Sequence, residues 1–225
     1  MMNEGIRLLK QGQYDRALQH LLNIHGDVPE NPELSYYLGL CYTHLDKYDE
    51  ALLYLEQVVS SELSFTHVYQ SRMILGYIYA VTSRHRLAEF EFRSILDDGF
   101  DSAKTHAALG FTLYAQGQLD ESIAELERAL ELDPNNGNAL NSLGFVLAET
   151  GKNPQRAVDY CRRAIRIRPK SAAYLDSLGW ACYKLGRIEE ARDALRSALN
   201  AAPGEKEIAV HLRQVMQHQS GERPS

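Results

Sequence analysis

The sequence predicts an all-α protein, a linear array of antiparallel helix pairs closed at its C-terminal end by one further helix. The first observation is a period, because six glycines recur 34 to 37 residues apart: Gly5, Gly39, Gly76, Gly110, Gly144 and Gly179. The second is that a small residue follows each glycine after 12 or 13 positions, and Leu, Phe or Cys after 16 or 17. The third is a proline at the end of four units: Pro29, Pro134, Pro169 and Pro203. A fixed period of this length indicates a repeat architecture.

Each unit has the pattern of two helices joined by a tight turn, which is clearest in the sixth. In its first half, apolar residues are spaced by three and four positions, as on one helix face: Tyr174, Leu178, Ala181, Cys182 and Leu185. Its second half repeats this stripe, with charged residues on the opposite face: Ile188, Ala191, Leu195, Ala198 and Leu199. Gly186 permits the turn because glycine tolerates positive φ. Pro203 ends the second helix because it has no amide hydrogen.

The units occupy approximately residues 1–31, 32–66, 69–102, 103–136, 137–171 and 172–203. Three extra residues interrupt the period near residues 61–66, and one more lies near Asn153 and Pro154. The third unit has Ser83 and His85 where a small turn residue and an aromatic residue usually stand. The first unit begins only four residues before Gly5. Its start is therefore either trimmed or frayed, or completed by a partner chain.

Residues 204–218 are expected to form a capping helix, because the last repeat of an array needs its apolar face covered. An apolar stripe is predicted to face the array: Ile208, Leu212, Val215 and Met216. His211 and His218 are expected on the solvated side, since no carboxylate or cysteine has metal-ligand spacing with them. Residues 219–225 are expected to be disordered.

Taken together, these landmarks resemble the tetratricopeptide repeat over residues 1 to about 203, and the last two units look like those of bacterial members. The resemblance implies a right-handed superhelical solenoid with a concave wall lined by the first helix of each pair. It also implies a non-enzymatic scaffold that binds a protein or peptide partner in that concave groove.

Composition and motifs exclude several other classes of protein. The chain has 225 residues and a formal net charge of −6, which disfavours nucleic acid as a partner. No apolar run approaches the roughly 20 residues that span a bilayer, so membrane insertion is not expected. No motif for a catalytic, phosphate-binding or zinc site is present, so neither enzymatic activity nor a cofactor or metal is expected.

Three cysteines lack the paired spacing of a disulfide framework, although two could approach each other between the fifth and sixth repeats: Cys41, Cys161 and Cys182. We expect buried, reduced thiols. The expected compartment is the cytoplasm, or the periplasm if a leader has been removed.

The candidate binding residues follow from helical geometry relative to the repeat glycines. The positions expected to face the groove form a ladder that becomes aromatic from the third repeat onward: Tyr36, Leu40, Met73, Tyr77, Phe111, Tyr114, Asn141, Phe145, Asp176, Trp180 and Tyr183. Exposed aromatic rings would anchor a helix or an extended segment. The alternative is that the rings stack on one another and fill the superhelix. No unit has the asparagine of a carboxylate clamp one residue after its glycine, so the ligand is expected to be apolar.

A basic run on the second helix of the fifth repeat suggests two further interpretations. It includes Arg162, Arg163 and Arg166. These arginines either pair with the neighbouring acidic helices, which stabilises little, or form a convex patch for an acidic partner. The alternative function is a structural or self-associating subunit of a larger bacterial envelope or motility assembly.

Overall fold

The computed structural model describes residues 2–24, 31–61 and 63–219, with side chains up to Gln217. This part of the chain contains thirteen helices and no strand, as the sequence predicts. The chain divides into two compact units, whose boundary lies between Phe100 and Asp101. Disorder is expected at residues 219–225, but Gln219 is the last residue of the final helix. The rest of that segment, residues 220–225, and the side chain of His218, which is expected in solvent, lie outside the described part.

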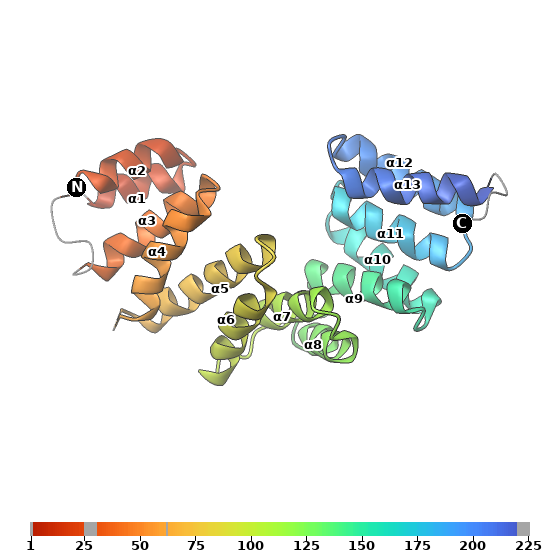
Figure 1. Ribbon diagram of the computed structural model, residues 1–225, viewed down its shortest axis with the longest axis horizontal. Coiled ribbons are helices and arrows are strands. Elements are labelled where there is room, and N and C mark those ends of the chain that lie inside the picture. Colours follow the sequence, from red (N-terminus) through yellow and green to blue (C-terminus); the bar gives the residue numbers. More distant parts are fainter. Residues whose placement is uncertain (1, 25–30, 62, 220–225) are drawn as a thin grey trace. The chain divides into compact units, whose positions relative to one another are not determined.

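The N-terminal unit contains three helix pairs (Figure 1). Their helices are α1 (Met2–Lys10), α2 (Tyr14–Leu22), α3 (Pro32–His44), α4 (Tyr48–Val59), α5 (Phe65–Val81) and α6 (His85–Asp97). Each pair packs on the next, since α2 contacts α3 and α4 contacts α5. The first helices also contact one another, α1 with α3 and α3 with α5.

The C-terminal unit contains three more pairs and the capping helix. Its helices are α7 (Ala103–Ala115), α8 (Leu119–Leu132), α9 (Gly137–Thr150), α10 (Pro154–Ile167), α11 (Ala172–Lys184), α12 (Ile188–Ala201) and α13 (Lys206–Gln219). The first helices α7, α9 and α11 contact in sequence, and α13 packs against α11 and α12. This arrangement places one face of α7, α9 and α11 beside the start of α13.

The repeat glycines are required by close helix packing. A Cβ at Gly179 would lie 2.5 Å from Cγ of Leu195, and one at Gly144 would lie 2.5 Å from Sγ of Cys161. A Cβ at each of the other four glycines would lie 2.5 to 2.7 Å from its Leu or Phe partner. These partners are the residues 16 or 17 positions downstream of each glycine. The spacing seen in the sequence therefore reflects the same helix–helix contact in all six repeats.

The turn within each pair places the residue seven positions after the repeat glycine at positive φ. Four of the six are glycines, and the other two are Asp46, with φ of 55°, and Ser83, with φ of 60°. Ser83 departs from the sequence pattern but adopts the same backbone conformation as the glycines. The extra residue near Pro154 is absorbed by Asn153, also at positive φ, whose side chain accepts a hydrogen bond from the amide of Arg156.

The insertion after the second repeat lengthens a helix. Helix α5 has 17 residues, whereas α3, α7 and α11 have 13. It begins at Phe65, so the expected boundary between residues 66 and 69 falls inside one continuous helix. The added turn is held by aromatic packing, because the rings of Phe65 and Tyr69 lie 4.7 and 4.6 Å from that of Phe100.

The capping helix differs from the sequence expectation at two residues. Ile208 and Val215 are buried as predicted, but Met216 is 39% exposed. His211, expected in solvent, is only 9% exposed. It is buried because two residues of α11 interact with its imidazole. Trp180 stacks on the ring, and Asp176 provides a carboxylate for Nδ1.

All three cysteines are free and buried, as expected. Burial raises the pKa of Cys41 to about 12 and that of Cys182 to about 11. The pKa of Cys161 is also raised by burial, and next by the neighbouring Cys182. The thiols therefore pack as small apolar side chains.

Candidate functional site

A groove of about 510 Å³ lies within the C-terminal unit. It is bounded by the first helices α7, α9 and α11 and by the segment that joins α12 to α13. Five of the residues predicted from the sequence line it together: Phe111, Tyr114, Asn141, Phe145 and Asp176. Nine others complete the lining: Ser142, Val146, Ala172, Ala173, Ser177, Ala202, Glu205, Glu207 and Ile208.

The apolar part of the groove is formed by three aromatic side chains on α7 and α9. Phe111 is 50% exposed and lies beside the rings of Tyr114 and Phe145 in the groove lining. The rings of Tyr114 and Phe145 meet edge to face, with centroids 5.7 Å apart. Both are half-buried. This arrangement leaves Phe111 and the outer parts of the other two rings available for contact.

Trp180 does not act as the exposed anchor that the sequence predicts. Its side chain is only 6% exposed, and its ring stacks on His211 with centroids 4.3 Å apart. Its indole Nε1 donates a hydrogen bond to Glu149. Tyr183, half-buried, lies beside it with ring centroids 5.3 Å apart. At this end of the ladder the alternative interpretation holds, because the rings fill the space beneath the cap.

Asp176 is buried against the capping helix. Nδ1 of His211 lies 2.9 and 3.1 Å from its two carboxylate oxygens, and each residue is 9% exposed. Burial lowers the pKa of His211, but the hydrogen bond and charge of Asp176, with smaller contributions from Glu207 and Glu149, raise it overall. Asp176 therefore fixes the cap that forms one end of the groove.

Asn141 contributes a polar atom to the groove lining. Its Oδ1 is buried and accepts no hydrogen bond from any described residue. A buried amide oxygen without a donor is destabilising.

The remaining predicted groove residues belong to the N-terminal unit. Tyr36 is buried, and its hydroxyl donates a hydrogen bond to Gln70. Leu40 and Met73 are half-buried, whereas Tyr77 is 52% exposed. Of these four, Tyr77 offers the largest apolar contact area.

The basic residues of α10 are largely engaged by neighbouring helices. Arg162 pairs with Glu190 at 2.7 Å, and Arg163 donates to the carbonyl of Pro134 at 2.7 Å. Arg166 is exposed and makes no ion pair with a described residue. The pairing interpretation thus accounts for Arg162, and a convex basic patch that includes Arg166 stays a prediction.

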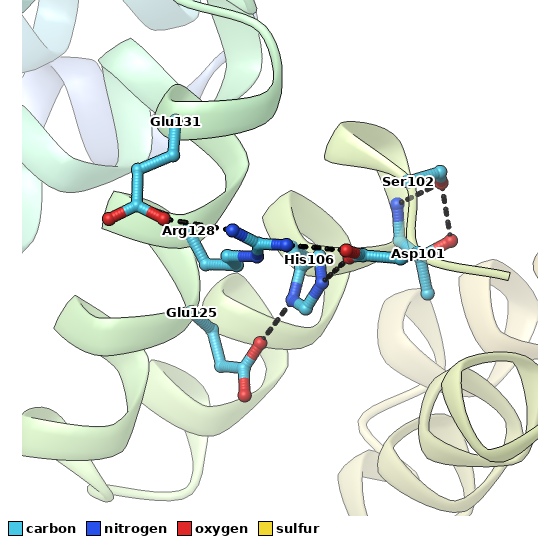
Figure 2. Close-up of polar contacts among 7 residues, drawn as sticks. Asp101, Ser102, His106, Glu125, Arg128 and Glu131 are labelled. Carbon is cyan, nitrogen blue, oxygen red and sulfur yellow. Dashed lines mark hydrogen bonds and ion pairs between the residues drawn. The ribbon is translucent and has the colours of Figure 1, made fainter. Parts of the chain in front are cut away.

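A second polar cluster joins the start of α7 to α8 (Figure 2). Nε2 of His106 lies 2.6 Å from Asp101, and its Nδ1 lies 2.5 Å from Glu125. Arg128 bridges Asp101 and Glu131 at 2.5 and 3.0 Å, and the hydrogen bonds from Arg128 and then His106 lower the pKa of Asp101. No group of His, Cys, Asp and Glu in the described part is arranged to hold a metal ion. We therefore interpret the cluster as an ion-pair network that positions two helices.

Sequence reasoning missed the acidic and small residues of the groove. Glu205 and Glu207 lie in the segment predicted to form the cap, and the sequence does not indicate which wall of the groove that segment joins. Ser142 and Ser177 each precede a predicted groove residue, Phe145 or Trp180, by three positions, so helical periodicity alone could have suggested them. The contribution of Ala202 requires knowing how α13 folds back after Pro203.

Comparison with known proteins identifies the family. Tetratricopeptide repeat profiles match residues 8–69 and 136–203, and a TPR repeat profile matches residues 110–151. The chain belongs to the tetratricopeptide repeat family.

A TPR repeat-containing protein of Pseudomonas aeruginosa is 35% identical over 107 residues, which is 44% of this chain and 18% of the relative. The chain thus spans less than a fifth of that protein. Among solved structures, the APC/C hetero-tetramer Cut9-Hcn1 matches with a TM-score of 0.80 and 20% identity, covering 92% of this chain and 40% of that one. YrrB, a TPR protein described as having an unusual peptide-binding site, matches with a TM-score of 0.57 and 20% identity, covering 89% and 97%. These structures share the fold.

No helix in the described part combines the length and the apolar character needed to cross a bilayer.

Proposed function

We propose that this protein is a non-enzymatic interaction protein that holds a segment of a partner chain in the groove of its C-terminal unit. The observation that carries the proposal is the gathering of Phe111, Tyr114 and Phe145 at a hollow of about 510 Å³, with Phe111 half exposed. Exposed aromatic side chains grouped in a concave surface supply binding energy when a partner covers them. The peptide-binding site named for YrrB, on the same fold, is consistent with this use of a repeat array.

The roles of the lining residues follow from their environment. Phe111 and Phe145 supply apolar contact area, and Tyr114 adds a hydroxyl. Asn141 adds a polar side chain to the lining. Asp176, already bonded to His211, shapes the end of the groove.

The test is affinity capture from a lysate of the source organism, with bound proteins identified by mass spectrometry. The wild type is compared with Phe111→Ala/Phe145→Ala. The matched control is Phe90→Ala, because Phe90 is 61% exposed on α6, outside the groove. We expect a partner that is retained by the wild type and the control and lost from the double variant. Identical partners on all three proteins would refute the groove as the binding site.

A second candidate is a self-associating structural subunit, such as one in a bacterial envelope or motility assembly. It is favoured by two apolar side chains three residues apart on α6, Leu87 and Phe90, which are 46% and 61% exposed. Sedimentation velocity over a range of concentrations tests it. Association that disappears in Leu87→Ser/Phe90→Ser would support this function, and a monomer at all concentrations would exclude it.

A further inference from the structure

The charged residues that line the groove are all acidic. They are Asp176, Glu205 and Glu207, and within the described lining no Lys, Arg or His accompanies them. A fourth carboxylate, Glu149, lies close enough to the groove to affect Tyr114. After burial, the charges of Glu149 and Glu207 are the causes that raise the pKa of Tyr114.

Two of these four carboxylates already have partners, and two do not. Asp176 bonds His211, while Glu149 lies 3.5 Å from Nζ of Lys184 and accepts the indole hydrogen of Trp180. Glu205 and Glu207 are exposed, and neither forms an ion pair with a described residue. Unpaired negative charge therefore collects at the end of the groove formed by the start of α13.

The helix dipole explains only part of this arrangement. Acidic side chains are favoured at a helix N-terminus, typically by less than about 1 kcal/mol at the surface. Asp49 and Glu50 occupy the first turn of α4 for the same reason. Glu205 and Glu207 differ from them because they also line a groove that holds half-exposed aromatic rings.

We propose that the partner of this groove is a basic, apolar segment. One or two bulky apolar side chains contact Phe111, Tyr114 and Phe145, and a neighbouring Lys or Arg reaches Glu205 and Glu207. The volume of about 510 Å³ suits a few side chains of a short segment. This inference rests on the proposed function of the groove and adds the chemistry of its ligand.

Charge complementarity also determines which segments bind poorly to the groove. An acidic segment would place like charges against Glu205 and Glu207, which opposes binding and gives specificity. Because the two glutamates are exposed, the attraction should weaken as salt screens it. The apolar contacts should be far less sensitive to salt.

The experiment uses the full chain and a phage-displayed library of random peptides of about 12 residues, a length suited to an extended or helical segment. Pools selected on the wild type and on Phe111→Ala/Phe145→Ala are sequenced. We expect the wild-type pool to be enriched in Lys and Arg next to bulky apolar residues, and depleted in Asp and Glu. The strongest peptide is then synthesised with a fluorescent label, and its affinity is measured by anisotropy.

Three variants test the charges directly. Glu205→Lys/Glu207→Lys should weaken binding by about tenfold, and Glu205→Gln/Glu207→Gln by a few-fold, since rim charges act mainly through attraction and steering. Asp49→Lys/Glu50→Lys is the matched control, because it makes the same charge change in the first turn of α4. Its affinity for the peptide should stay within about twofold of the wild type.

The outcomes separate this inference from the proposed function. Peptides that need Phe111 and Phe145 but show no basic enrichment, or no loss on charge reversal, would overturn the basic ligand and leave the groove as the binding site. Peptides that bind equally to the aromatic double variant, or a library that yields no binders, would overturn both.

Discussion

Asp176 on α11 and His211 on α13 form a buried hydrogen-bonded pair, with Nδ1 of the imidazole 2.9 and 3.1 Å from the two carboxylate oxygens. The same imidazole stacks on Trp180. His211 of the capping helix thus pairs with a carboxylate and stacks on an aromatic ring of the last repeat. Since Glu205 and Glu207 lie at the start of the same helix, this pair also helps to hold the acidic end of the groove in place.

The first prediction concerns the pH dependence of this pair. The pKa of His211 is raised in the folded protein, so its stabilisation is fully present below the ordinary histidine value of about 6.5 and is lost as pH rises through the folded value. His211→Gln should lower the free energy of unfolding of the C-terminal unit by about 1.5 to 3 kcal/mol at low pH. The difference from the wild type should narrow as pH rises through the folded-state pKa and the imidazole becomes neutral.

Urea unfolding across this pH range, followed by tryptophan fluorescence, measures the effect, because Trp180 is the only tryptophan. Asp176→Asn provides the control. In that background burial lowers the pKa of His211, so the stability difference caused by His211→Gln should no longer narrow as pH rises. A stability difference that is constant with pH, or one that widens as pH rises, would contradict the assigned charge state.

The second prediction concerns the turn between α5 and α6. Ser83 has φ of 60°, where the corresponding residues of four other repeats are glycines. A left-handed conformation costs a residue with a Cβ about 1–2 kcal/mol. Ser83→Gly should therefore stabilise the N-terminal unit, by about 0.5 to 1 kcal/mol after the entropy lost by glycine is subtracted.

The reciprocal change supplies the check. Gly117→Ser places serine at φ of 78° in the turn between α7 and α8, and should destabilise the protein. Both effects are measured by thermal unfolding with circular dichroism. If Ser83→Gly lowers the midpoint, the turn is not under the backbone strain assigned to it.

These turns also show how far the sequence specifies the fold. The period, the contacts of the repeat glycines and the helix pairs were predictable because each depends on local spacing repeated six times. The greater length of α5 was not predictable, since it depends on the contact between Phe65 and Phe100, which lie 35 positions apart in the sequence. The sequence predictions that Trp180 and His211 are exposed were wrong for a similar reason. Helical geometry assigns a residue to a face, but only the packing of α13 decides whether that face is open or covered.

The third prediction tests the glycine contacts. Gly179→Ala would place a Cβ 2.5 Å from Leu195 and 3.0 Å from the carbonyl oxygen of Ala191. Leu195 can move only partly and the backbone carbonyl less, so the variant should lose about 1–3 kcal/mol of unfolding free energy. Gly204→Ala is the matched control, because a Cβ there meets nothing within 4 Å. Equal stability of the two variants in urea would show that the helices have room for the methyl group.

The fourth prediction concerns the three thiols. They are buried, and burial raises the pKa of Cys41 to about 12 and that of Cys182 to about 11. Because the thiolate is the reactive form, all three should react slowly with a disulfide reagent such as DTNB in the native protein. Three thiols per chain should react rapidly in denaturant. Fast reaction of one thiol under native conditions would indicate local opening at that helix pair.

The fifth prediction compares a buried ion pair with an exposed one. Arg72 and Glu91 lie 2.9 Å apart, with side chains 19% and 10% exposed. Burial raises the pKa of Glu91 although Arg72 opposes this, so the carboxylate depends on its partner. Arg72→Met should destabilise the N-terminal unit by up to about 3 kcal/mol, and adding Glu91→Leu should recover much of the loss. Arg162→Met, which breaks the exposed pair with Glu190, should cost less than about 1 kcal/mol.

Urea unfolding of the single and double variants separates the two contributions. The decisive quantity is the unfolding free energy that the double variant regains over Arg72→Met. It separates the cost of leaving the buried Glu91 carboxylate unpaired from the loss of the attraction between the two side chains. Additive effects of Arg72→Met and Glu91→Leu would mean that Glu91 is better solvated than its 10% exposure indicates. The pair would then stabilise the contact between α5 and α6 no more than Arg162 and Glu190 stabilise that between α10 and α12.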